Sequence, residues 1–377
     1  MGENKLKILI VGAGLSGSII ARELVDNNTN VSITVIDKRN HLAGNCFTKR
    51  DLQTNIMEHI YGPHIFHTNK VHVWQYINKY VKMMPFENRV KITTDKGVFS
   101  MPINLHTINQ FFNQTFNPQE AADFIALQSD KSIIDPQTFE DQALKFLGKD
   151  LYYNFFYHYT KKQWGCEPTE LPASILKRLP VRFNYNDNYF NDQYQGIPEF
   201  GYTEFVEKLL DHSNIKVCLS TDYLDDMMHG FDHIFYSGAI DSFYKYQFGR
   251  LGYRTVFFEK SYHDGDVLGN AVINNATKGT PYTRQHEHKH FAYWEQHDKS
   301  IVYTEYSKET EIDDEPFYPK RFESDVALYN KYKELANRDN KKFTFIGRLG
   351  TYRYLDMNVI IEETLDLVKN INYFNDK

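Results

Sequence analysis

A glycine motif between two apolar runs is the feature that most constrains this chain. Residues 7–11 (KILIV) lead directly into GAGLSG at 12–17, and the apolar run 31–36 ends at Asp37, twenty residues after the last glycine. This is the G-x-G-x-x-G pattern of a strand–turn–helix–strand unit. Its glycines permit a tight turn and a close approach to a pyrophosphate, and the acidic residue accepts a hydrogen bond from a ribose. Free N–H groups at the start of the helix face the phosphates. The motif predicts a parallel α/β sheet around a dinucleotide, the alternative being an ordinary βαβ unit.

The composition excludes several classes of protein. The 377 residues carry a formal net charge of −6, which argues against nucleic acid as a partner because no broad basic surface is implied. Three widely separated cysteines, Cys46, Cys166 and Cys218, make no disulfide framework and suit a reducing compartment. No run reaches the roughly 18 apolar residues of a membrane span, and the first strand starts too early to leave room for a signal peptide. We therefore expect a cytoplasmic protein that binds neither nucleic acid nor membrane.

Apolar runs like those of the opening unit recur near residues 215, 231 and 343. They predict a nucleotide-binding domain that the chain leaves and re-enters. A helical pattern from 106 to 178 and a period-two pattern from 250 to 306 lie between these runs. The predicted fold class is therefore α/β, with a discontinuous Rossmann-like domain, a helical insert domain and an antiparallel β-sheet domain.

The chain divides into seven predicted segments. The nucleotide-binding domain takes 1–85, 201–240 and 326–377, the sheet domain takes 86–105 and 241–325, the helical domain takes 106–178, and an irregular lid and sheet segment takes 179–200. Proline in a first helical turn predicts helix starts at Pro118 and Pro136. The alternating residues His290, Ala292 and Trp294 predict a strand.

Longer motifs follow one another along the chain. They are YGPHIFHT at 61–68, YTKKQWG at 159–165, LKRLPVRF at 176–183, NYF at 188–190, QGIP at 195–198, PYTR at 281–284 and GRLGTYRYLDM at 347–357. In this order they resemble the bacterial UDP-galactopyranose mutase family over nearly the whole chain. The resemblance implies FAD rather than NAD at the glycine motif, active in its reduced form. It also implies interconversion of UDP-galactopyranose and UDP-galactofuranose through a covalent adduct of the sugar and the reduced flavin. Galactofuranose supply for surface polysaccharide, reduction by NAD(P)H or another external reductant, and a homodimer are further implications.

Three alternatives stay open at this point. Relatives of the family act on other sugar nucleotides, such as UDP-N-acetylgalactosamine or a dTDP-deoxysugar. An FAD-dependent amine or alcohol oxidoreductase would share the glycine motif, and so would a binding protein without activity. The oxidoreductase would not need paired arginines for a diphosphate. The presence of Arg178, Arg284, Tyr318 and Tyr354 together argues against the binding protein.

The resemblance assigns roles to individual residues. Arg178 and Arg284 would bind the diphosphate and take part in catalysis with His67, because guanidinium groups match phosphate oxygens and stay charged. The other substrate contacts would be Phe155, Phe156, Tyr159, Thr160, Trp164, Tyr189, Arg254, Asn274, Tyr318, Tyr354 and Asn88. The FAD contacts would be Gly12, Gly14, Leu15, Ser16, Asp37, Lys38, Gly44, Asn45, His64, Ile65, Arg348, Tyr354, Asp356 and Met357. Phe155 and Tyr159 also have helical spacing, so a stripe in a helix core is the rival interpretation.

Histidines at 64 and 67, and again at 286, 288 and 290, have spacings that suit metal ligands. The first pair has no acidic or cysteine companion nearby, and the family uses no metal. We therefore predict no metal site, because a stable site needs a complete set of ligands.

Overall fold

The computed structural model describes residues 5–178 and 181–370, apart from the side chains of Lys177 and Arg178. Five parallel strands form its first sheet, in the order β10 (Ile215–Cys218), β2 (Val31–Ile36), β1 (Leu6–Val11), β11 (His233–Tyr236) and β17 (Phe343–Phe345). Three separate stretches of the chain supply these strands. This confirms the predicted discontinuous Rossmann-like domain.

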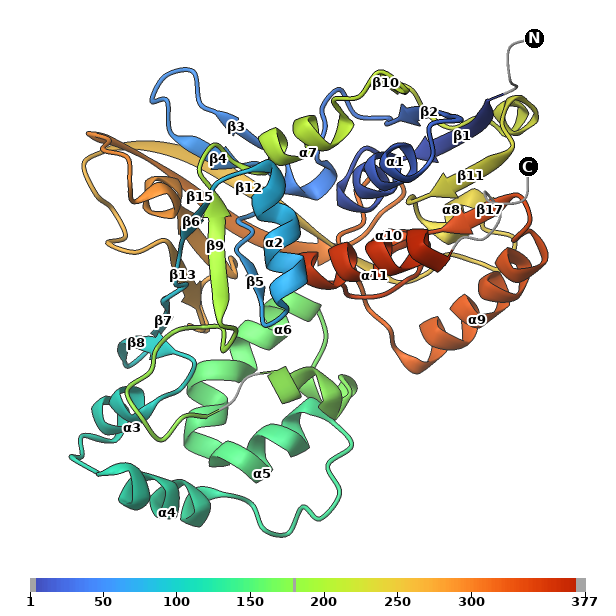
Figure 1. Ribbon diagram of the computed structural model, residues 1–377. Coiled ribbons are helices and arrows are strands. Elements are labelled where there is room, and N and C mark those ends of the chain that lie inside the picture. The colour runs from blue at the N-terminus through green and yellow to red at the C-terminus, as the bar shows by residue number, and fades with distance from the viewer. Residues whose placement is uncertain (1–4, 179–180, 371–377) are drawn as a thin grey trace.

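Helices cover both faces of this sheet, so successive residues of its central strand β1 are buried on both sides. Ile8 and Ile10 pack with α1 in the main core, whereas Leu9 between them packs on the other side with Phe243. The helices around the sheet are α1 (Leu15–Asn27), α7 (Tyr202–Leu210), α8 (Ile240–Phe243), α9 (Glu323–Arg338), α10 (Gly347–Gly350), α11 (Met357–Asn370) and the 3-10 helix η5 (Asp225–Gly230). Figure 1 shows this domain beside both ends of the chain, with the helical insert at the opposite end of the molecule.

A second, seven-stranded sheet lies beside the first domain. Its strand order is β16 (Tyr318–Pro319), β12 (Tyr253–Asp264), β15 (Lys299–Glu309), β14 (Arg284–Glu287), β13 (Val272–Asn275), β7 (Val90–Thr94) and β8 (Gly97–Met101). All its pairs are antiparallel except β13 with β7. The predicted antiparallel domain is therefore confirmed, with one parallel pair that the sequence did not indicate.

One predicted strand in this region is wrong. The residues from His288 to Ala292 form a 3-10 helix, η6, rather than a strand through Trp294. The buried side chains are His288, Phe291 and Ala292, and a spacing of three brings side chains together on one face of a 3-10 helix. The alternation of His290, Ala292 and Trp294 was a pattern of residue types that did not match the pattern of burial.

The helical insert contains α3 (Leu105–Phe112), α4 (Pro118–Gln128), α5 (Phe139–Leu151), the π-helical turn η2 (Tyr152–Tyr157), α6 (His158–Trp164), and the 3-10 helices η3 (Pro168–Glu170) and η4 (Ala173–Arg178). The predicted start of α4 at Pro118 is confirmed, with Asn117 as its N-cap. The start predicted at Pro136 is wrong by three residues. Thr138 caps α5 instead, because its side chain accepts from the Asp141 N–H while Asp141 bonds back to the cap.

Shorter elements connect the three parts. They are α2 (Val71–Tyr80), the strands β3 (Thr48–Arg50), β4 (Met57–His59), β5 (Phe66–Thr68), β6 (Met83–Pro85) and β9 (Tyr194–Pro198), and the 3-10 helix η1 (Gly44–Cys46). β9 pairs with both β5 and β6, so it joins the stretch after the helical insert to the first part of the chain. Among the described residues, no helix has the length and apolar character needed to cross a bilayer.

Candidate active site

A cavity of about 630 Å³ opens at the carboxyl ends of β1, β2 and β11, the usual ligand position in such sheets. The turn after β1 forms one wall, and close packing fixes its shape. A Cβ on Gly17 would lie 2.1 Å from the Gly12 carbonyl oxygen, and Gly12 itself has a φ of +108°. Glycine is therefore required at both positions, and α1 begins directly beside the cavity with Gly14 as its N-cap.

Asp37 ends β2 at the rim of this cavity and is buried. Its carboxylate accepts the backbone N–H of Ala13 (2.9 Å) and of Arg39 (2.9 Å). These bonds orient the carboxylate and leave lone pairs for ribose hydroxyls.

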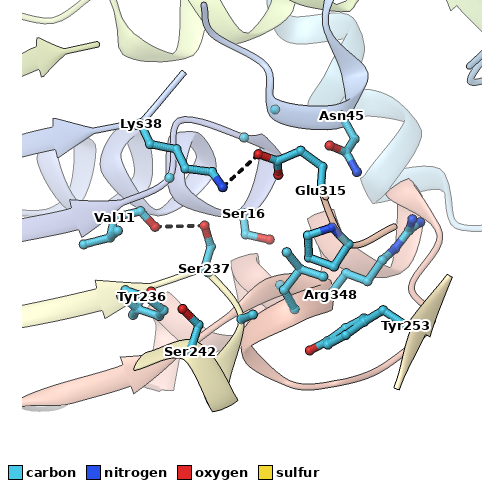
Figure 2. A pocket seen from close by; sticks show the side chains of 18 of the residues that line it. Val11, Ser16, Lys38, Asn45, Tyr236, Ser237, Ser242, Tyr253, Glu315 and Arg348 are labelled. Atoms are coloured by element: carbon cyan, nitrogen blue, oxygen red, sulfur yellow. Dashed lines mark hydrogen bonds and ion pairs between the residues drawn. The ribbon is translucent and has the colours of Figure 1, made fainter. Parts of the chain in front are cut away.

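Glu315 reaches across the mouth of the cavity from the loop after β15. It pairs with Lys38 at 2.8 Å and with Arg39 at 3.1 Å. Figure 2 shows the Lys38–Glu315 pair, with Ser16, Asn45 and Arg348 around the same space. These two ion pairs thus connect the two walls of the cavity.

Most of the residues predicted to contact the cofactor line this cavity. They are Gly12, Gly14, Leu15, Ser16, Asp37, Lys38, Gly44, Asn45, His64, Arg348 and Met357. Ile65, Tyr354 and Asp356 do not line it. The sequence reasoning missed Ser237 and Gly238, although they follow β11 at the same sheet edge where the signal could have been found. The glycine turn, the helix N-terminus and the acidic side chain together fit a dinucleotide such as FAD.

Arg284 lies on β14 directly opposite Glu305 on β15. Its Nε donates to Oε2 of Glu305 at 2.8 Å, and Nε2 of His286 donates to the same oxygen at 3.0 Å. Within the described parts of the chain, the other two guanidinium nitrogens of Arg284 make no hydrogen bond to protein. They are therefore available to a ligand.

Glu305 and His286 are almost completely buried. Burial alone would raise the pKa of Glu305, but the charge of Arg284 and the hydrogen bond from His286 outweigh it and lower that pKa. Glu305 therefore stays ionised and keeps Arg284 charged. The sequence reasoning missed Glu305, because its value depends on strand register; a charged residue after the apolar positions Ile301 and Tyr303 was the available signal.

Tyrosines surround Arg284 and connect it to the cavity. The rings of Tyr318 and Tyr354 stack with centroids 5.6 Å apart, and the Arg348 guanidinium lies 5.5 and 5.1 Å from them. Arg284 also lies close enough to Tyr159 and Tyr318 to act on their pKa values. Burial raises both, and that of Tyr318 reaches about 12, so these phenols are neutral hydrogen-bond donors near neutral pH.

The two histidines of the 61–68 motif occupy different surroundings. His64 lines the cavity, and its Nδ1 donates to the Gly62 carbonyl at 2.8 Å. Burial, followed by the charge of Arg348, lowers the pKa of His64 to about 4, so it is neutral near pH 7 with Nε2 free of a proton. His67 instead stacks on Phe190 and bonds through Nδ1 to Asp192 at 2.6 Å, outside the cavity lining.

Four of the other residues predicted for the substrate are Phe155, Asn88, Asn274 and Arg178. Phe155 packs edge-on against Phe99 and Phe111 in the helical core, which favours the core interpretation for this residue. Asn88 and Asn274 are buried, and the Oδ1 of each has no hydrogen-bond partner among the described residues, as expected where a ligand supplies the missing donor. The side chain of Arg178 lies outside the described residues.

The other residues predicted for the substrate lie as follows. Phe156 and Thr160 are buried in the insert, while Tyr159 and Trp164 of α6 are partly buried against the same core. The backbone N–H of Tyr189 donates to the Asn88 carbonyl at 2.8 Å, so the stretch after the insert lies against Asn88. Asp356, predicted for the cofactor, directly precedes α11, and its carbonyl accepts the Ile360 N–H at 3.0 Å.

Comparison with known proteins places these features in a family. The family model described as UDP-galactopyranose mutase matches residues 154–354, and the model of an NAD(P)-binding Rossmann-like domain matches 10–80. A probable UDP-galactopyranose mutase of Klebsiella pneumoniae is 55% identical over 96% of this chain and 94% of its own. A dTDP-fucopyranose mutase of Escherichia coli is 48% identical over 96% of this chain and 97% of its own.

Solved structures agree in fold. The crystal structure of reduced UDP-galactopyranose mutase has a TM-score of 0.77 at 12% identity, over 99% of this chain and 97% of that chain. A double mutant of putrescine oxidase has a TM-score of 0.61 at 10% identity, over 97% of this chain and 99% of that chain. These identities are low, so the structural matches establish the fold alone.

Proposed function

Because this chain belongs to the UDP-galactopyranose mutase family, whose members are isomerases, we propose that it interconverts UDP-galactopyranose and UDP-galactofuranose with bound, reduced FAD. One observation carries the proposal. Arg348 lines the dinucleotide cavity and also lies over Tyr318 and Tyr354, beside Arg284. A nucleotide cofactor and a diphosphate substrate would therefore meet at this arginine.

The chain's own groups have distinct tasks in this reaction. Arg284 binds the diphosphate through its two outer nitrogens and stabilises the charge that develops as UDP leaves the sugar. Neutral tyrosines donate hydrogen bonds to the diphosphate and sugar oxygens. Because its Nδ1 donates to the Gly62 carbonyl, neutral His64 has Nε2 available to accept a hydrogen bond from a ligand at the cavity wall. Reduced FAD, when bound, supplies a nucleophilic ring nitrogen for the anomeric carbon.

The identity of the sugar is the second question, since the 48% identical relative is named a dTDP-fucopyranose mutase. We favour UDP-galactose because the more similar of the two named relatives carries that name. The external reductant, the homodimer, the cytoplasmic location and the supply of galactofuranose to polysaccharide stay predictions.

A single assay tests the proposal. The purified protein is loaded with FAD, reduced with dithionite, and given UDP-galactofuranose, while an oxidised sample serves as the control. Formation of the pyranose only in the reduced sample supports the mutase. Reduction of oxidised flavin by an amine or alcohol would instead identify an oxidoreductase, and faster turnover of dTDP-fucose would change the sugar.

A further inference from the structure

We propose that Arg254 is a positioning residue that fixes the end of α6 to the seven-stranded sheet, rather than a direct contact of the substrate as the family resemblance implies. The proposal rests on the proposed function, because it concerns the side of the site where α6 carries Tyr159 and Trp164. If the nucleoside binds against α6, the position of this helix relative to Arg284 sets the geometry of the whole substrate.

The contacts of Arg254 all point to the helix end and its support. Nε donates to the Gln163 carbonyl at 3.1 Å, and Nη2 lies 3.5 Å from the Lys162 carbonyl. The hydroxyl of Ser307 donates to the same Gln163 carbonyl at 2.7 Å and accepts from Nη2 at 3.1 Å. Carbonyls in the last turn of a helix have no partner inside the helix, so these bonds satisfy groups that would otherwise be left unpaired.

The charge of Arg254 also suits this position. The C-terminal end of a helix carries a partial negative charge, which a guanidinium stabilises. Glu309 pairs with Nη1 at 3.2 Å, so all three nitrogens of Arg254 are engaged by protein acceptors. Arg284 differs, because in the described part of the chain only its Nε is engaged.

Gly165 is matched to this arrangement. It follows Trp164, ends α6 in the left-handed conformation with a φ of +71°, and a Cβ there would lie 2.4 Å from Nη1 of Arg254. Glycine therefore serves both the helix end and the close approach of the guanidinium.

A single strand connects the two arginines. Glu305 and Ser307 are two residues apart on β15, so their side chains share a face roughly 7 Å apart along the strand. Glu305 holds Arg284, and Ser307 with Arg254 holds α6. β15 thus sets the distance between Arg284, which would bind the diphosphate, and α6, which carries Tyr159 and Trp164.

The test compares two ligands that differ only in the diphosphate. Binding of uridine and of UDP to the FAD-loaded protein is measured by ligand-observed NMR and calorimetry for wild type and Arg254→Met. We expect both ligands to weaken by the same factor, about tenfold for the loss of a charge-assisted hydrogen bond. Arg284→Ala is the matched control and should weaken UDP while leaving uridine unchanged.

Further variants separate positioning from a general loss of stability. Gly165→Ala should reproduce the effect of Arg254→Met, and the double variant should be no worse than either alone, because both changes remove the same contact. Arg254→Lys should recover part of the uridine affinity. KM should rise in these variants while kcat and FAD content stay near wild type.

Several results would overturn the proposal. Weaker UDP binding with unchanged uridine binding in Arg254→Met would make Arg254 a diphosphate ligand, and unchanged binding of both would remove it from the site. A wild type that binds UDP but not uridine would show that α6 does not hold the nucleoside. A wild type that binds neither ligand and turns over no UDP-sugar would refute the proposed function as well.

Discussion

The dinucleotide cavity and the side chains around Arg284 (the Arg284 cluster: Tyr159, Arg284, Glu305 and Tyr318) are built in different ways. The cavity is formed largely by backbone at strand ends, where glycines and a helix N-terminus meet. The Arg284 cluster is formed by long side chains from α6, β14, β15 and β16. The first depends on short motifs that bring their own geometry, and the second depends on which residues face each other across strands. A substitution in one region should therefore weaken cofactor binding or substrate binding without weakening the other.

The largest expected effect is a loss of turnover in a variant of the Arg284 cluster that still binds its cofactor. Arg284→Ala should lower turnover by a factor on the order of 10²–10³, because a positioned donor to developing charge is lost. FAD content, measured by flavin absorbance per protein, should stay the same. Full turnover in this variant would remove Arg284 from the site.

A control for this variant concerns stability. Arg284→Ala leaves the buried Glu305 carboxylate without its partner, which costs about 3–5 kcal/mol in comparable cases. Arg284→Met combined with Glu305→Gln leaves no buried charge, so the unfolding free energy should recover while turnover stays low.

The converse change concerns the cavity. Gly17→Ala should destabilise the turn by about 1–3 kcal/mol, because its Cβ would overlap the Gly12 carbonyl oxygen. The purified protein should then hold little FAD. Gly230→Ala is a matched control, since a Cβ there meets nothing within 4 Å. Normal FAD content in Gly17→Ala would contradict the close packing of this turn.

A smaller effect is expected at Trp164 of α6, where the base of UDP would stack. Trp164→Ala should weaken UDP binding about tenfold, within the range measured for the stacking of one base on an aromatic ring. Trp164→Phe should keep much of the affinity. Unchanged UDP affinity in Trp164→Ala, measured by calorimetry, would return Trp164 to a purely structural role.

The smallest effect concerns the bridge across the cavity mouth. Glu315→Gln should speed FAD dissociation up to about fivefold, since a partly exposed ion pair contributes about 0.2–1 kcal/mol. High salt should reduce the difference from wild type. Glu204→Gln, which breaks an exposed pair on α7, should not change the rate. Equal FAD release rates in Glu315→Gln and wild type would show that the bridge does not retain the cofactor.

The same contrast explains what the sequence could predict. The glycine motif and Asp37 predicted the cavity and the parallel sheet around it, since each residue acts through local backbone geometry. The sequence offered a signal for Glu305 as a charged residue on a predicted strand, but it could not give the partners of Glu305 or Ser307, because these are set by the register of β15 with β12 and β14. The strand expected at His290 failed because tertiary burial, not residue type, decided the local structure.

Helical periodicity had a similar limit. Phe155 and Tyr159 have the spacing of residues on one face of a helix. Phe155 nevertheless packs inside the insert, while Tyr159 lies near Arg284. The π-helical turn at 152–157 changes the angle between their side chains around the helix axis, and no pattern of residues predicted this turn.

The order in which the sheet is assembled has a consequence for biosynthesis. β1 and β2 are made first, but β11 and β17 are more than 190 and 300 residues further along, and Gly347 and Arg348 of the cavity wall come later still. A nascent polypeptide therefore has no partner for the second edge of β1 until β11 is made. Truncated products that end before β11 would leave that edge unpaired and would lack Gly347 and Arg348 of the cavity wall.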